Sequence, residues 1–502
     1  MTDLLAARAQ MAMSLAFHII FAAPGVAMPL LMVISEWRWL RTRDETWLVL
    51  TKRWAKGTAI LFAVGAVSGT VLSFELGLLW PRFMHFAGAI IGMPFSLEGF
   101  AFFTEAIFLG IYLYGWERVR PRVHLLAGVV VAVSGAASAV FVVIANAWMN
   151  TPAGFRLVDG QAVDVDPLAA MQNPAAFPQT LHMLLAAYAA TGFVVAGIHA
   201  YLLLGDRENR FHRHALAVAL AVGGVTAVLQ PLSGDLLAKA VARNQPAKLA
   251  AFEGHFKTER GAPLRIGGMP DEAAGVTRYA LEIRYGLSLL AFNDPHAVVK
   301  GLEEFPRDQW PPVAVVHIAF QIMIAAGFGM MAVALWGAYL AWRRRTLVSS
   351  RNFLRAVVCA APLGFLAIEA GWVVTEVGRQ PWIIYGVMRT AEAVTPMPGL
   401  IAPFLVFTLL YLFLAAVVVW LLWRQVAHSP RLISGETATV ELTVRPLSRQ
   451  FLKLQSPAAE RLLSVARRFN AGKARQWLLV AERRLNHFRG PRSRKAQPSL
   501  RD

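Results

Sequence analysis

The chain has 502 residues, of which 56% are hydrophobic and only 16% are charged, and this composition excludes an ordinary soluble globular protein. Its formal net charge of +18 would suggest nucleic-acid binding in a soluble protein. Here the basic residues gather in short loops and in the C-terminal tail, which indicates membrane topology, so we expect a lipid bilayer and no nucleic acid as partner. The single cysteine, Cys359, excludes an intrachain disulfide.

Apolar runs long enough to cross a bilayer, about twenty residues each, recur along the chain. We therefore predict an all-α polytopic membrane protein with nine transmembrane helices. The runs lie near residues 11–35, 57–79, 92–115, 124–147, 180–204, 215–236, 313–341, 353–374 and 401–423.

Arginine and lysine concentrate in alternate loops, which the positive-inside rule places in the cytoplasm. The N-terminus is then outside and the C-terminus cytoplasmic, and the longer loops of mixed charge face outward. We divide the chain into spans one to six, an outer loop, spans seven to nine, and a basic amphipathic tail expected to lie on anionic lipid. These parts cover residues 1–236, 237–312, 313–424 and 425–502.

Two acidic residues, Glu98 and Glu105, lie seven residues apart in the third span. Seven residues make nearly two helical turns, so both carboxyl groups project from one face, about 10 Å apart along the axis. Buried carboxylic acids can be neutral and exchange protons through water, which favours a proton relay. The alternative is that each carboxyl is bound separately by a neighbouring helix.

Four further polar or sulfur-containing side chains lie in the outer half of the membrane once the orientation is set. They are His18, His182, Met323 and Glu376. Each histidine could be a packing residue or an iron ligand, and methionine in an apolar helix is usually a packing residue. Their common depth suggests haem groups near the outer face, with histidine and methionine as the axial pair of a low-spin haem. No CxxCH motif is present, so any haem is held non-covalently.

The outer loop contains NQPAKLAAFEGHFKT, which by itself predicts a short amphipathic helix on the surface. Lys248 and Glu253 lie there beside apolar residues. A carboxylate and an ammonium next to an apolar surface also suit a quinol, whose hydroxyl groups release protons as electrons leave.

Several motifs occur in the order typical of one family. They are FHIIFAAPGVAMPLLM, PFSLEGFAFFTEAIF, VIANAWMNTP, QPAKLAAFE and GWVVTEVGRQPW. Together they resemble subunit I of the cytochrome bd quinol oxidases, from the first span to the eighth. The C-terminal tail lies outside the resemblance. The short segment between the KLAAFE motif and span seven resembles the short quinol-loop branch, which includes the cyanide-insensitive oxidases.

The resemblance implies three haems near the periplasmic face: a low-spin haem b, a high-spin haem b, and a haem d or a further haem b in its place. His182 and Met323 would ligate the low-spin haem. His18 and Glu376 would serve the two high-spin haems, in an order that the family leaves open. Trp372 and Arg379 match the family's residues at the edge of the haems. Glu98 and Glu105 match its proton-path glutamates. Lys248 and Glu253 match its quinol-loop residues.

The implied activity is a terminal quinol:oxygen oxidoreductase of the bacterial inner membrane. Quinol, ubiquinol or another, would be oxidised at the periplasmic side, and O2 would be reduced to water with cytoplasmic protons, without pumping. The family also implies a membrane partner, subunit II, and a possible single-span accessory subunit. One departure is Gln321, where some relatives place arginine near a haem.

Two other functions are compatible with the residues alone. A secondary transporter or proton channel could be lined by the same intramembrane glutamates and histidines. A haem protein could also transfer electrons without reducing oxygen. Reduced-haem absorbance would distinguish the oxidase from a transporter or channel. Quinol-driven oxygen uptake would distinguish it from a haem protein that only transfers electrons.

Overall fold

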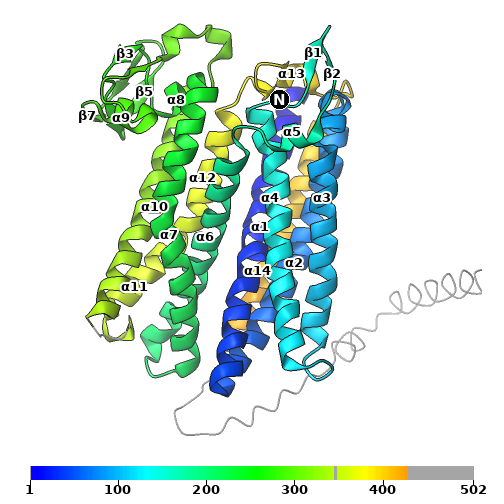
Figure 1. The fold of residues 1–502 in the computed structure, drawn as a ribbon, viewed down its shortest axis with the longest axis vertical. Helices are drawn as coiled ribbons and strands as arrows, with labels where there is room; N and C mark the ends of the chain where they lie inside the picture. The colour runs from blue at the N-terminus through cyan, green and yellow to red at the C-terminus, as the bar shows by residue number, and fades with distance from the viewer. Residues whose placement is uncertain (1, 344–346, 428–502) are drawn as a thin grey trace, which may run out of the picture. The chain divides into compact units, whose positions relative to one another are not determined.

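The computed structural model describes residues 2–343 and 347–427. The amphipathic helix predicted in the C-terminal tail lies outside these residues. The described chain is a bundle of long helices with short elements gathered at one end (Figure 1).

Nine helical segments among the described residues are long and apolar enough to cross a membrane, which confirms the predicted fold class of an integral membrane protein. They are α1 (Asp3–Thr42), α2 (Glu45–Leu79), α3 (Pro81–Tyr114), α4 (Pro121–Asn150), α6 (Ala176–Gly205), α7 (Arg210–Asn244), α10 (Val313–Trp342), α11 with α12 (Arg351–Ala360 and Leu363–Val377), and α14 (Ile401–Ala427).

Most helices extend beyond the predicted apolar runs, because polar residues continue a helix outside the hydrocarbon. The sixth span shows this most clearly: α7 continues to Asn244, so the outer loop begins at residue 245 and not at 237. The eighth span is interrupted at Ala361 and Pro362, between α11 and α12. Proline has no backbone N–H to donate to the preceding turn, which accounts for the break.

The remaining elements are short. The helices are α5 (Pro167–Met171), α8 (Pro246–Phe252), α9 (Gly286–Phe292) and α13 (Thr390–Ala393), with 3-10 helices η1 (Leu302–Glu304), η2 (Arg307–Gln309) and η3 (Leu347–Ser349). The strands are β1 (Arg156–Val158), β2 (Gln161–Val163), β3 (Glu259–Arg260), β4 (Leu264–Ile266), β5 (Met269–Asp271), β6 (Val276–Arg278), β7 (Leu281–Ile283), β8 (Val298–Val299), β9 (Trp382–Ile384) and β10 (Met388–Arg389). They pair antiparallel as β1–β2, β3–β8, β4–β7, β5–β6 and β9–β10.

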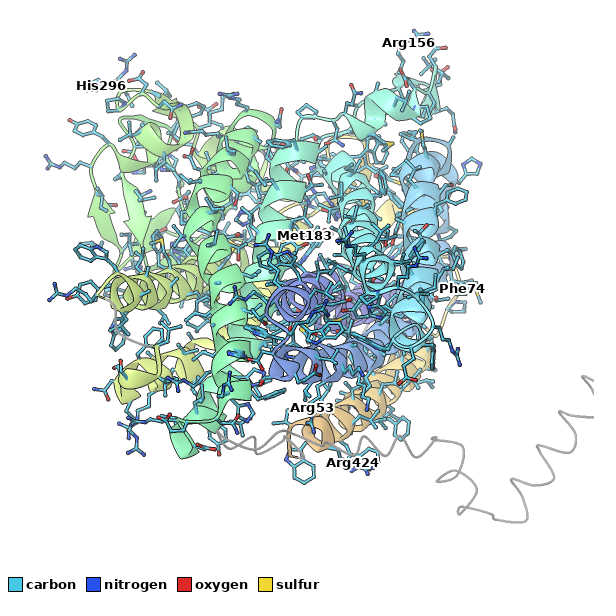
Figure 2. The ribbon with its side chains drawn as sticks, turned by 60° about the horizontal axis from the view of Figure 1, so that its bottom comes forward. Arg53, Phe74, Arg156, Met183, His296 and Arg424 are labelled. Carbon is cyan, nitrogen blue, oxygen red and sulfur yellow. The ribbon has the colours of Figure 1, made fainter. Side chains whose placement is uncertain are left out.

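The two ends of the bundle differ in character. We call the end that carries residues 245–312 the loop end; the hairpin β1–β2, α5 and α13 lie there too (Figure 1). The opposite end, which we call the basic end, holds the turns joining α1 to α2, α3 to α4 and α6 to α7. Arg53 and Arg424 lie toward the basic end, and Arg156 and His296 toward the loop end (Figure 2).

Small residues let the central helices approach closely. A Cβ atom added to Gly192 of α6 would lie 2.5 Å from the Cα atom of Gly223 in α7. One added to Gly364 of α12 would lie 2.3 Å from the Cα atom of Ala190 in α6. Such contacts are how helices associate where lipid offers no hydrophobic driving force. By contrast, several large side chains of α2 and α3 are exposed, and Phe74 is 67% exposed at the side of the bundle (Figure 2).

Candidate haem and quinol sites

His18 lies on α1 and is held by a serine from the next helix. Its Nδ1 atom is 3.0 Å from the Ser68 hydroxyl oxygen, and that hydroxyl donates its own hydrogen to the Val64 carbonyl oxygen at 2.9 Å. The serine oxygen must therefore accept a hydrogen from Nδ1, which leaves the Nε2 lone pair free. Gly69 makes room beside the ring, because a Cβ atom there would lie 3.0 Å from His18 Cε1.

His182 on α6 has the same arrangement. Its Nδ1 atom lies 3.0 Å from the Ser233 hydroxyl oxygen, and that hydroxyl donates to the Gln230 carbonyl oxygen at 2.9 Å. The Gln230 amide nitrogen donates to the His182 carbonyl oxygen at 3.1 Å and lies 3.3 Å from Nε2. A glycine again adjoins the ring, since a Cβ atom on Gly234 would lie 3.5 Å from His182 Cε1.

Met323 on α10 places its thioether against a third glycine. A Cβ atom on Gly371 of α12 would lie 3.1 Å from Met323 Sδ. His182 and Met323 lie on helices that both pack against α7 and α12. The resemblance implies that these two side chains would hold the same haem.

Both carboxylate oxygens of Glu376 accept a hydrogen bond. Asn146 of α4 donates to Oε1 at 2.6 Å, and Arg379 donates through Nη2 to Oε2 at 2.6 Å. The Arg379 side chain is only 3% exposed, and within the described residues its Nε and Nη1 atoms have no hydrogen-bond partner. Trp372 is partly buried one turn before Glu376, on the same face of α12.

Lys248 extends from the outer loop into this same region. Its ammonium group donates to the Asn150 side-chain oxygen at 2.5 Å and to the Thr375 carbonyl oxygen at 3.2 Å. Burial, reinforced by Arg379 and opposed by Glu376, holds the pKa of Lys248 well below its usual 10.5. The predicted surface helix is therefore wrong in its placement, because residues 247–252 of α8 are all buried.

Two asparagines of α4 connect Lys248 to Glu376. Asn150 accepts from Lys248, and its amide nitrogen lies 3.0 Å from the Asn146 carbonyl oxygen and 3.2 Å from the Asn146 side-chain oxygen. Gln179 of α6 also donates to the Asn146 side-chain oxygen, at 2.7 Å. None of these three amide side chains is among the site residues predicted from the sequence. The four-residue spacing of the two asparagines was the available signal.

Glu253 directly follows α8 and, like Lys248, is buried. It is 5% exposed, and its Oε2 atom has no hydrogen-bond partner in the described chain. Burial raises the pKa of Glu253 from 4.5 to about 8, with Arg265 offsetting part of the increase. A buried carboxyl that is protonated at neutral pH and has a free oxygen suits proton exchange with a bound hydroxyl group.

Gln321 has a structural role in the outer loop. Its side-chain oxygen accepts from the Gly267 backbone nitrogen at 3.0 Å, and its amide donates to the Arg265 carbonyl oxygen at 3.3 Å. One turn earlier, His317 lies 2.8 Å from the Phe252 carbonyl oxygen and 3.0 Å from that of Gly267. The Gln321 and His317 side chains of α10 thus hold the outer loop against the bundle through hydrogen bonds to its backbone.

Glu105 and Glu98 lie on α3, away from these contacts. Glu105 is 6% exposed and packs against α4, where a Cβ atom on Gly135 would lie 3.1 Å from its carboxyl group. Glu98 is partly buried two turns closer to the loop end. Their shared helix and spacing agree with the predicted relay, which remains a prediction.

The side chains present fit haem on the chemistry of their atoms. In both histidines Nε2 is the unprotonated nitrogen that can hold iron, and Met323 offers a thioether sulfur. In His182 the Gln230 amide nitrogen lies 3.3 Å from Nε2, so this amide would have to turn away when iron binds. A carboxylate has about four lone-pair sites, so Glu376 retains two beyond its hydrogen bonds to Asn146 and Arg379. The unpaired Nε and Nη1 donors of Arg379 suit a propionate carboxylate.

Comparisons with known proteins identify the family of this chain. The chain matches the model of the family described as cytochrome bd terminal oxidase subunit I over residues 6–430. It is 39% identical over 430 residues to the Bacillus subtilis (strain 168) protein named "Putative cytochrome bd menaquinol oxidase subunit I", covering 84% of this chain and 96% of that protein. It is 32% identical to the cytochrome bd ubiquinol oxidase subunit 1 of the same organism, covering 85% and 94%.

A solved structure extends the likeness to three dimensions. The bd oxidase from Geobacillus thermodenitrificans matches with a TM-score of 0.81 and 41% sequence identity, over 86% of this chain and 99% of that one. Because the family model spans most of the chain and the fold of the solved relative matches 86% of it, this protein belongs to the cytochrome bd terminal oxidase subunit I family.

Proposed function

We propose that this chain is the quinol-oxidising and oxygen-reducing subunit of a terminal oxidase. The observation that carries the proposal is the matched pair His18 and His182, each with Nδ1 donating to a serine hydroxyl so that Nε2 is the unprotonated nitrogen. Its membership of the family supports haem as the cofactor. The relatives named menaquinol and ubiquinol oxidases support a quinol as the substrate.

In this proposal, His182 and Met323 hold a low-spin haem b, and His18 and Glu376 serve two high-spin haems, one b and one d or a further b. When bound, the haems supply electron transfer and the reduction of O2 to water. Ser68 and Ser233 set the tautomers of the two histidines. Arg379 neutralises a propionate, and Trp372 borders the same group.

The quinol binds in the outer loop next to Lys248 and Glu253. Glu253 takes a proton from a quinol hydroxyl through its unpaired Oε2 atom. Lys248, held by Asn150, keeps a positive charge or a donor beside the region where electrons enter. Protons released here leave at the loop end, which we place outside by the positive-inside rule.

Glu105 and Glu98 carry protons from the basic end toward the oxygen site. The basic end would face the cytoplasm, with the N-terminus outside. Consuming cytoplasmic protons and releasing protons outside builds a proton-motive force without a pumping element. Subunit I of this family normally pairs with subunit II; we also propose the bacterial inner membrane as location and a small accessory subunit as a further partner.

His18→Ala tests the assignment of the oxygen site. Quinol-driven oxygen uptake by the purified complex is expected to disappear, because the imidazole that would hold one high-spin haem is lost. The low-spin haem spectrum should persist, since His182 and Met323 are unchanged. A Ser73→Ala variant, on the same α2 helix as Ser68 but exposed, should keep normal uptake. Unchanged uptake in His18→Ala would refute the assigned role.

The pKa of Glu253 predicts the pH dependence of quinol oxidation. The group must be ionised to accept a proton, and its pKa is raised to about 8, so kcat/KM for quinol should rise as pH approaches that value and then level off. Glu253→Gln should lower kcat/KM and abolish the rise. Glu282→Gln removes an exposed carboxylate bound to the same Arg265, and should keep it. A pH profile of Glu253→Gln identical to the wild type would contradict the role.

A further inference from the structure

Three buried side chains form a hydrogen-bonded cluster at the basic end, outside the proposed haem and quinol sites. Glu36 of α1, Tyr112 of α3 and His124 of α4 are 0%, 0% and 2% exposed. The Nδ1 atom of His124 lies 2.8 Å from Glu36 Oε1, and its Nε2 atom lies 2.9 Å from the Tyr112 carbonyl oxygen. The cluster thus ties together three helices near the turn that joins α3 to α4.

The geometry determines where the protons are. A carbonyl oxygen can only accept, so His124 Nε2 carries a hydrogen and donates it to Tyr112. The contact between Nδ1 and Glu36 Oε1 then needs one more proton, held by the imidazole or by the carboxyl group. In both forms the pair has no net charge, which makes its burial tolerable. Glu36 and His124 therefore share one proton that can move between them.

The cluster also contains polar atoms without hydrogen-bond partners, which would not be expected if the cluster only stabilised the fold. Glu36 Oε2 and the Tyr112 hydroxyl have no hydrogen-bond partner in the described part of the chain. The two groups are close enough to interact electrostatically. Unpaired polar atoms are costly in a buried site, and water molecules that bridge such groups are the usual remedy. A water bridge here would extend the shared proton toward α3.

Tyr112 of the cluster and Glu105 of the proposed proton path lie on the same side of α3, against α4. Tyr112 lies seven residues after Glu105 on α3, about 10 Å along the same face of the helix. On α4, two glycines that are also seven residues apart, Gly128 and Gly135, lie against the Tyr112 and Glu105 side chains. A Cβ atom on Gly128 would lie 2.7 Å from the Tyr112 ring, and one on Gly135 would lie 3.1 Å from the Glu105 carboxyl group. The α3–α4 interface therefore accommodates two polar side chains, Tyr112 near the basic end and Glu105 about 10 Å further along the helix.

The cluster lies just under the aqueous surface. The Trp116 ring covers His124, with 3.9 Å between ring centroids, and the Lys52 ammonium lies 5.2 Å from the Trp116 centroid. Glu117, next in the chain, is exposed. The partly exposed Trp116 ring thus lies between His124 and the surface of the basic end.

We propose that Glu36 and His124 are the proton-loading pair that supplies Glu105 from the basic end, with Tyr112 as the connecting group. This inference rests on the proposed oxygen-reducing function. The pair gives its shared proton through Tyr112 and water to the Glu105 carboxylate, which becomes a neutral acid. The pair then regains one proton from water at the basic end, past Trp116, so each cycle moves one proton and no electrons.

Glu36→Gln tests the proposal in the complete complex with subunit II, reconstituted in lipid nanodiscs. Glutamine keeps the shape and an acceptor oxygen but cannot release a proton at neutral pH. Quinol-driven oxygen uptake should fall about tenfold or more, the scale expected for loss of a proton donor. Proton uptake, followed with a pH-indicator dye as the reduced complex reacts with O2, should slow equally, with a larger rate ratio between H2O and D2O. The haem content and reduced spectrum should stay normal.

Two further variants make the outcome decisive. Tyr112→Phe removes only the hydroxyl group and should slow proton uptake several-fold, whereas Glu117→Gln, an exposed carboxylate at the same end, should change nothing. Wild-type proton uptake in both Glu36→Gln and Tyr112→Phe would overturn the proposal, and so would loss of haem in Glu36→Gln together with normal uptake in Tyr112→Phe. Absence of quinol-driven oxygen uptake in the wild-type complex would instead refute the proposed function.

Discussion

Glu376→Ala is expected to remove a haem from the purified complex and to destabilise it. The carboxylate is the only hydrogen-bond partner shown for the Arg379 guanidinium within the described residues, and Arg379 is 3% exposed. Breaking a buried pair leaves an uncompensated charge, which costs about 3–5 kcal/mol; the 28% exposure of Glu376 favours the lower value. Asn146 would lose its acceptor as well. Haem content from a pyridine-haemochrome spectrum and the thermal unfolding midpoint measure the two effects.

Asp308→Ala is the matched control for this variant. Asp308 pairs with Arg389 at 2.5 Å, also at the loop end, but the two side chains are 62% and 34% exposed. An exposed pair contributes about 0–1 kcal/mol, so this variant should keep its haems and most of its stability. If Glu376→Ala retained every haem, Glu376 would not be an iron ligand. If both variants lost the same stability, the burial argument for Arg379 would be wrong.

Lys248→Met is expected to abolish quinol-driven oxygen uptake while the dithionite-reduced haem spectrum stays normal. Methionine has nearly the length of lysine but no charge and no hydrogens to donate. The Asn150 oxygen and the Thr375 carbonyl oxygen would lose their donor, and the link from the outer loop through α4 to Glu376 would be cut. We expect kcat/KM for quinol to fall about a hundredfold or more, the effect of losing a positioned hydrogen-bond donor at a reacting centre.

Lys257→Met provides the comparison in the same loop. Lys257 is exposed, nine residues after Lys248, and its loss should leave kcat/KM for quinol unchanged. Oxygen uptake with several quinols and the reduced spectrum of each variant give the result. Normal quinol oxidation in Lys248→Met would show that the lysine only anchors the loop. Loss of the haem spectrum would show that it supports the haem region instead.

The number and type of the membrane helices could be predicted from the sequence because hydropathy is a local property. An apolar run of sufficient length must form a helix in lipid, where no water can satisfy the backbone. The ends of the helices were less predictable. Polar residues such as Lys239 and Arg243 belong to α7 even though they lie outside the apolar run.

The candidate ligands were also visible in the sequence, but their partners were not. His18 meets Ser68 and His182 meets Ser233, which lie 50 and 51 residues away along the chain. The partners of Glu376 and Lys248 on α4 are 230 and 98 residues away. No local pattern links residues at such separations, so only the packing of the helices identifies Asn146 and Asn150.

The sequence by itself determined the class of this protein, its spans and the residue types that can bind haem, because these depend on composition, spacing and motifs within single segments. The tertiary structure decided which of those residues have the environment that their roles require. It buried Lys248 beside Asn150, left two donors of Arg379 unpaired, and brought Glu36 to His124 across 88 residues. The physical reason is that desolvation and hydrogen bonding act between neighbours in space, and these neighbours lie on different helices.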